Sequence, residues 1–154
     1  MAGFKKAKAE QAALKMSCYG PPGSGKTFSA LLIAEGLAAL TKKRIAFIDS
    51  ERGTDFYCQD VPERKAHPAG FDFDALYTKS LTEILTSVKQ LSFAEYGVIV
   101  IDSITHVWEA AKAAFSGKTN KIGQIPMWAW GSIKKPYKDL INFLISCVPM
   151  ESLY

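Results

Sequence analysis

Residues 20–27 read Gly20-Pro21-Pro22-Gly23-Ser24-Gly25-Lys26-Thr27, and the fold of this chain follows from them. They match the pattern G-x-x-x-x-G-K-[ST], in which each residue type has a physical task. The glycines let the backbone bend so that successive N–H groups converge, and the helix N-terminus that follows adds partial positive charge. Lys26 adds a mobile full charge, and Thr27 offers a hydroxyl oxygen that suits Mg²⁺. The stretch therefore predicts a phosphate-binding P-loop.

The segments around this motif alternate between short apolar runs and amphipathic stretches, which is typical of α/β proteins. We expect a short strand over 13–19 before the motif and a helix over 27–40 after it. An ordinary glycine turn is the structural alternative. The strand-turn-helix setting favours the P-loop instead.

Further helices are predicted downstream. Ser80-Leu81-Thr82-Glu83 reads as a capping box that opens a helix ending near Gly97. Apolar residues at helical spacing predict a helix over 105–115 and another that begins at or near Pro136. Prolines and Gly70 interrupt residues 54–79, where we expect a loop with short elements.

Two apolar runs, 45–48 and 98–101, read as buried strands. The second run ends at Asp102, and a carboxylate in that position can hold Mg²⁺ through water. Aspartates commonly end buried strands, so the signal gains its weight from the P-loop nearby. Asp102 is the metal carboxylate we expect, together with Thr27.

Hydrolysis also needs a group that positions the attacking water. Ser103 follows Asp102, so the adjacent glutamate of many ATPases is missing. Asp49 and Glu51 follow the 45–48 run, and the carboxyl ends of parallel strands face one crevice. A solvated loop glutamate paired with Arg52 is the structural alternative for Glu51.

The base of the nucleotide is predicted by exclusion. Asp102-Ser103-Ile104-Thr105 lacks the glycine of the DxxG pattern, and Gly123 stands where the NKxD pattern needs a carboxylate. ATP is therefore favoured over GTP. The arginines Arg44, Arg52 and Arg64 are few for clamping a transferring phosphoryl group, which weighs against a small-molecule kinase.

Composition sets the broad class. The 154 residues suit one domain, and 48% hydrophobic with 22% charged residues is ordinary for a globular protein. A net charge of +4 tolerates nucleic acid without indicating it. Cys18, Cys58 and Cys147 form no CxxC and favour a reducing cytoplasm. We expect neither export nor membrane insertion, because the first 15 residues lack an apolar core and no apolar run reaches membrane-spanning length.

Three blocks together resemble the RecA-like branch of P-loop ATPases, and more closely the phage-type AAA ATPase domains of phage and prophage recombination proteins. The blocks are Tyr19–Thr27, Ile45–Gly53 and Val98–Trp108. The resemblance implies a three-layer α/β fold with a mainly parallel sheet, and ATP with Mg²⁺ in the cytoplasm of a bacterial or phage-infected cell. It places the water-activating glutamate on Glu51 and the Walker B aspartate and serine on Asp102 and Ser103.

The resemblance also implies a further strand between the P-loop strand and the Walker B strand, after the last helix. Nothing plausible for it follows Pro149, so we expect a C-terminally truncated core with two unpaired sheet edges. In such a core nucleotide binding should survive better than turnover. We treat 1–154 as a single domain whose residues 1–11 are frayed.

In the resembling recombinases a loop after the Walker B helix contacts single-stranded DNA, and residues 116–138 match it. The stretch mixes positive charge with stacking faces, as single-strand binding requires, although a solvated loop with buried tryptophans explains it equally well. Its residues are Lys118, Lys121, Lys134, Lys135, Lys138, Trp128, Trp130 and Tyr137. His67 and His106, which have no second histidine or cysteine nearby in sequence, read as surface or packing residues.

The predicted function is Mg²⁺-dependent ATP binding and hydrolysis in DNA recombination or single-strand handling. The alternatives are a non-catalytic ATP-binding module that regulates assembly with a partner, and a small-molecule kinase. Candidate partners are ATP, single-stranded DNA and further copies of the chain, without a membrane. The expected catalytic residues are Glu51 and Lys26, the metal ligands are Thr27 and Asp102, and the nucleotide-binding residues are Gly20, Pro21, Pro22, Gly23, Ser24, Gly25, Lys26, Thr27 and Phe28.

Overall fold

The structure is a computed structural model that describes residues 13–116 and 125–147. Its sheet has three parallel strands in the order β2-β1-β3. The strands are β1 (Arg44–Asp49), β2 (Asp74–Tyr77) and β3 (Tyr96–Asp102). The helices are α1 (Lys26–Thr41), α2 (Asp55–Cys58), α3 (Leu81–Gln90), α4 (Ile104–Ser116) and α5 (Trp130–Ser146), with a 3₁₀ turn η1 (Met127–Ala129) before α5.

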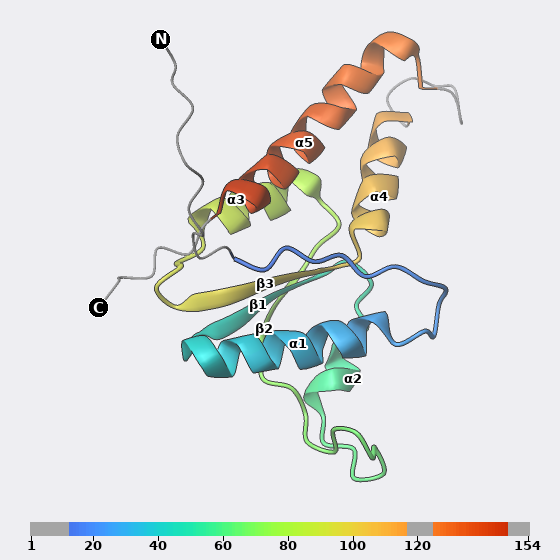
Figure 1. Cartoon of the computed structure of the whole chain (residues 1–154). Helices are drawn as coiled ribbons and strands as arrows, with labels where there is room; N and C mark the ends of the chain where they lie inside the picture. The colour runs from blue at the N-terminus through green and yellow to red at the C-terminus, as the bar shows by residue number, and fades with distance from the viewer. Residues whose placement is uncertain (1–12, 117–124, 148–154) are drawn as a thin grey trace, which may run out of the picture.

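Helices cover both faces of the sheet: α1 and α2 lie on one side, and α3, α4 and α5 on the other (Figure 1). Side chains of β1 alternate between these faces. Phe47 packs with Leu31 of α1 in one core cluster, and Ile48 packs with Ile84 of α3 in the other. The run 45–48 is apolar throughout because both of its faces are buried. The predicted three-layer α/β fold with a mainly parallel sheet is confirmed.

The segment before the P-loop differs from the prediction. Residues 13–19, predicted as a strand, form neither helix nor strand. Most of their side chains face solvent, and Tyr19 is 96% exposed. Among the described residues no strand pairs with the outer edge of β3. Without a neighbouring strand, the segment has no ladder in which its backbone groups could pair.

Two helix boundaries were predicted wrongly. Helix α3 ends at Gln90 rather than near Gly97, because Leu91 is extended and Gly97 already lies inside β3. Helix α5 begins at Trp130 and contains Pro136, since buried Ile133 anchors the turn before the proline. The predicted helices over 27–40 and 105–115 and the strands at 45–48 and 98–101 are confirmed within one or two residues at each end.

The region 54–79, expected to be a loop with short elements, holds the four-residue helix α2 and the four-residue strand β2, whose positions no sequence pattern indicated. Strand β2 is four residues long, and none of its side chains is fully buried. It is held by its pairing with β1. Within the described residues, none of the helices combines the length and the hydropathy that a membrane crossing requires.

Candidate functional site

The glycine-rich loop makes a tight turn into the N-terminus of α1. Gly23 and Gly25 have φ of 77° and 82°, a left-handed conformation that favours glycine. Gly20 has φ of 157°, which other residues rarely adopt, and a Cβ there would also approach Ser24 Oγ to 2.9 Å, so this position favours glycine too. Gly25 ends the loop directly before α1, whose first amides lack intrahelical partners. The loop therefore has the shape of an anion-binding turn.

Lys26 lies across this loop. Its Nζ donates hydrogen bonds to the carbonyl oxygens of Gly20 at 3.1 Å and Pro21 at 3.0 Å. The ammonium group is solvent-accessible, so it can leave these carbonyls for a phosphate oxygen without disturbing the core. The structure thus brings Lys26 to the loop that it was predicted to serve.

Thr27 and Asp102 meet across 75 positions of sequence. Thr27 Oγ1 donates a hydrogen bond to Asp102 Oδ2, which joins the first turn of α1 to the end of β3. A hydroxyl and a carboxylate oxygen side by side are hard ligands of the kind that Mg²⁺ takes, with water completing its octahedron. The pair fits the predicted metal, and the two residues that would hold it are Thr27 and Asp102.

Phe28 was predicted among the nucleotide-binding residues. Its ring packs edge-on against Phe71, with 5.6 Å between ring centroids, in the core cluster on the α1 face of the sheet. The Arg64 guanidinium lies 5.8 Å from the ring centroid of Phe28. The side chain therefore packs against the core, and only the backbone of Phe28, in the first turn of α1, is left to face a phosphate at the loop.

Asp49 shapes the turn that carries Glu51. Its buried carboxylate accepts hydrogen bonds from the backbone N–H groups of Glu51 and Arg52, each at 2.7 Å. Thr54 donates its N–H at 3.1 Å and its hydroxyl at 2.6 Å to the other oxygen. Burial alone would raise the pKa of Asp49, but these hydrogen bonds outweigh it and hold the pKa below its usual value. Of the two candidate carboxylates, Asp49 is occupied as a structural acceptor.

Ser50 ties the ends of β1 and β3 together. Its N–H donates to the Asp102 carbonyl at 2.8 Å, and its hydroxyl donates to the Ser103 carbonyl at 3.0 Å. The Ser103 N–H donates back to Ser50 Oγ at 2.9 Å. Asp49 and Asp102 are register partners in the sheet, so these hydrogen bonds of Ser50 hold the turn that carries Glu51 beside the Asp102 carboxylate.

Glu51 contacts the helix that follows β3. Its Oε1 lies 2.9 Å from His106 Nδ1, and the same ring nitrogen lies 3.2 Å from Ser103 Oγ. The side-chain contact found for Glu51 is thus with His106 and not with Arg52, the partner offered by the structural alternative. The contacts link Thr27, Asp102, Ser103, His106 and Glu51 in one continuous run.

Sequence reasoning missed His106, which it assigned to packing or surface. The signal that could have found it is position: the predicted helix 105–115 follows the strand that ends at Asp102, and His106 lies in the first turn of that helix. The first turn of a helix that starts at a strand end lies beside the crevice at that end of the sheet. A histidine there is a candidate neighbour of any carboxylate at the end of β1.

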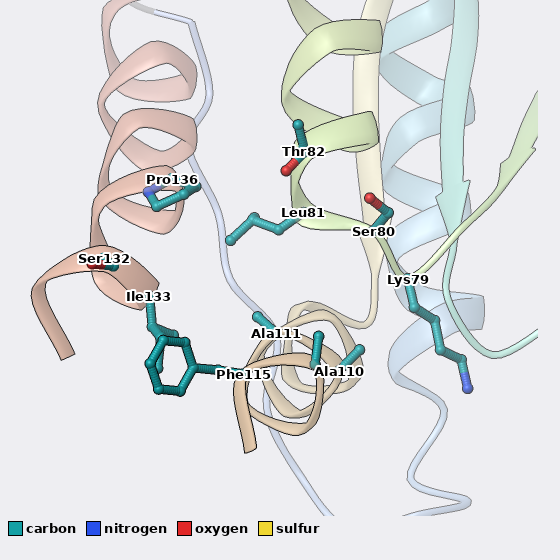
Figure 2. Close-up of a pocket in the computed structure, with 11 residues that line it drawn as sticks. Lys79, Ser80, Leu81, Thr82, Ala110, Ala111, Phe115, Ser132, Ile133 and Pro136 are labelled. Atoms are coloured by element: carbon teal, nitrogen blue, oxygen red, sulfur yellow. The ribbon is translucent and has the colours of Figure 1, made fainter. Parts of the chain in front are cut away.

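A separate cavity of about 490 Å³ lies between α3, α4 and α5. Figure 2 shows Leu81, Phe115 and Ile133 around it, and none of the predicted site residues lines it. Its walls are mostly apolar and alanine-rich, and no carboxylate lines them. The chemistry predicted for this chain therefore belongs to the strand ends and not to this cavity.

The predicted DNA-contacting stretch is described from Ile125 onward, and Lys118 and Lys121 lie outside the described residues. Trp128 is 77% exposed and Met127 is 89% exposed. Trp130 and Tyr137 instead pack against Trp108 of α4, with ring centroids 6.3 Å and 5.3 Å away. Three lysines of α5 are exposed beside them, Lys134, Lys135 and Lys138. An exposed aromatic ring in η1 therefore precedes a helix that carries three exposed lysines.

A glycine-rich turn before a helix, a lysine across it and a threonine against a strand-end aspartate define a P-loop nucleotide-binding domain. Comparison with protein families matches residues 12–149 to the AAA domain. The chain belongs to this family and is a P-loop AAA-type ATPase domain. Neither the curated proteins nor the solved structures that were searched contain a chain matching it.

Proposed function

We propose that this domain binds ATP with Mg²⁺ and hydrolyses it, in the service of DNA recombination or single-strand handling in a bacterial or phage-infected cytoplasm. The observation that carries the proposal is the run of contacts from Thr27 through Asp102 to Glu51. The proposal is supported by the proximity of the P-loop threonine, the Asp102 carboxylate and the solvent-accessible Glu51 carboxylate at the ends of two adjacent strands.

Each group has a task in the hydrolysis. The loop amides and Lys26 bind the β- and γ-phosphates and offset their charge. A Mg²⁺ ion held by Thr27 and Asp102 would neutralise charge on the same phosphates. Glu51 accepts a proton from water as the water oxygen bonds to the γ-phosphorus and the bond to the bridging oxygen of ADP breaks. Asp49 keeps the Glu51 backbone in place.

Single-stranded DNA is the partner we propose for the face formed by η1 and α5. The support is Trp128, which protrudes, and the exposed lysines Lys134, Lys135 and Lys138. An exposed ring can stack on a base, while lysines track phosphates. Further copies of the chain are a second proposed partner, because the outer edge of β3 has no described strand beside it.

Phosphate release and ATP binding, measured on the same variants, test the hydrolysis. Glu51→Gln and Lys26→Ala should each lower turnover by roughly 100-fold or more. Only Lys26→Ala should also abolish ATP binding, since Glu51 acts on water rather than on the nucleotide. Glu63→Gln, a change at an exposed glutamate outside the site, is the matched control.

The outcomes separate the alternatives. Wild-type protein that binds ATP but releases no phosphate, with single-stranded DNA present, is a non-catalytic binding module whose assembly responds to nucleotide. Transfer of the γ-phosphoryl group to a small acceptor instead of water identifies a kinase. Equal turnover in Glu51→Gln and the wild type removes Glu51 from the reaction.

A further inference from the structure

His106 is the member of the contact run that no sequence pattern assigned to the site. It lies in the first turn of α4, while the Glu51 that it contacts lies in the turn after β1. The two residues are therefore joined only by the folded structure. We propose that His106 is a positioning residue. It holds the Glu51 carboxylate where this group can accept a proton from the attacking water, an inference that rests on the proposed function.

The chemistry of the contact determines which ring nitrogen of His106 carries a hydrogen toward Glu51. A carboxylate only accepts hydrogen bonds, so His106 Nδ1 must carry the hydrogen that points at Glu51 Oε1 across 2.9 Å. Ser103 Oγ, 3.2 Å from the same nitrogen, then accepts a weaker share of that hydrogen. The pair holds one carboxylate oxygen of Glu51 and leaves Oε2 to accept a proton from water.

Glu51 is thus held at two points. Asp49 fixes its backbone N–H, and His106 fixes its side chain. The His106 and Glu51 side chains are 47% and 48% exposed, so solvent screens their attraction and the pair adds little to folding stability. Loss of the His106 ring should therefore be seen in turnover and hardly at all in unfolding.

The tautomer of His106 can be read without any turnover. The chain has two histidines, so long-range ¹H–¹⁵N spectra of the full ¹⁵N-labelled protein hold two ring systems, and His106→Asn identifies the one that disappears. We expect the Nδ1–H form in the wild type. In Glu51→Ala the Ser103 hydroxyl can donate to Nδ1 instead, so the ring proton should move toward Nε2. A wild-type ring protonated on Nε2 alone, or one unchanged by Glu51→Ala, overturns the proposal.

Kinetics then test the role of the contact. His106→Ala should lower kcat roughly 10- to 100-fold with KM and ATP affinity unchanged, because the carboxylate is misplaced while the phosphate grip is intact. His106→Asn should recover most of the rate, since its amide nitrogen lies as many bonds from Cβ as Nδ1 does. Thr105→Ala, an exposed neighbour in α4, is the matched control.

The two proposals fail in different ways. If phosphate is released and His106→Ala keeps the wild-type kcat or exceeds it, the positioning role is wrong and the ATPase stands. If the wild type releases no phosphate, the ATPase and the kinetic role of His106 both fail, whereas the tautomer experiment still decides whether His106 holds Glu51.

Discussion

Asp49 is a buried carboxylate that is stabilised by the hydrogen bonds that it accepts. Its carboxylate accepts hydrogen bonds from three backbone N–H groups and one hydroxyl. These four protein donors take the place of water around the carboxylate, in the turn that carries Glu51. Such an arrangement favours the charged form, in keeping with the lowered pKa of Asp49. The same residue therefore links the stability of the β1 end to the position of Glu51, the side chain proposed to activate water.

Asp49→Asn should lower the free energy of unfolding by about 2 kcal/mol at pH 7, because an amide places an NH₂ against backbone donors. The wild-type contribution is fully present above the ordinary aspartate pKa of about 4 and is lost as the pH falls through the lower folded pKa. Urea unfolding at pH 7 and pH 3 measures both effects, and the loss between them should shrink in the variant. Asp72→Asn, at an exposed aspartate, is the control; an equal loss in both variants contradicts the prediction.

At the scale of elements, the sequence predicted what depends on local pattern. The loop glycines, the apolar strands around Phe47 and Val100, and the helix capped by Ser80 each carry their own signal, and Ser80 Oγ does accept the Glu83 N–H at 3.3 Å. Strand β2 and the start of α5 depend on tertiary partners instead. Proline usually marks a first turn, but the burial of Ile133 extends α5 before Pro136.

The site divides in the same way. Lys26, Thr27 and Asp102 stand in motifs whose spacing fixes their position, and they were found from the sequence. The contact between His106 and Glu51 depends on the hydrogen bonds by which Ser50 joins the ends of β1 and β3. No local sequence pattern encodes these hydrogen bonds. Glu51 itself came from resemblance, and the residue that contacts its carboxylate could come only from the fold.

Trp128, in η1, should contribute to single-strand binding by stacking. Trp128→Ala is expected to weaken the affinity for a labelled oligothymidylate by roughly 5- to 150-fold, the range that one stacked base provides. Met127→Ala, at the adjacent exposed apolar side chain, should change it little. Fluorescence anisotropy at low and moderate salt measures both variants. Absence of wild-type binding at low salt, with ATP and without it, would exclude this face as a DNA site.

At the scale of the whole molecule, ligand and fold are coupled through α1. This helix carries the P-loop at its N-terminus and packs Leu31 into the core cluster that contains Phe47 of β1. The Thr27–Asp102 contact adds a second link, from α1 to the end of β3. A nucleotide held by the loop therefore stabilises the native state as a unit, since the unfolded chain offers no such grip.

ATP with Mg²⁺ at about 100 times Kd should raise the free energy of unfolding by about 2.7 kcal/mol and the Tm by roughly 5 to 10 °C. Lys26→Ala should abolish this shift because the triphosphate loses its main counter-charge. Removal of Mg²⁺ with EDTA should reduce the shift, because the phosphates then lose the ion that Thr27 and Asp102 would hold. Differential scanning calorimetry compares these cases with Lys65→Ala, a change at an exposed lysine that should keep the full shift. A shift of the same size in Lys26→Ala, or one indifferent to EDTA, would place the nucleotide elsewhere on the molecule.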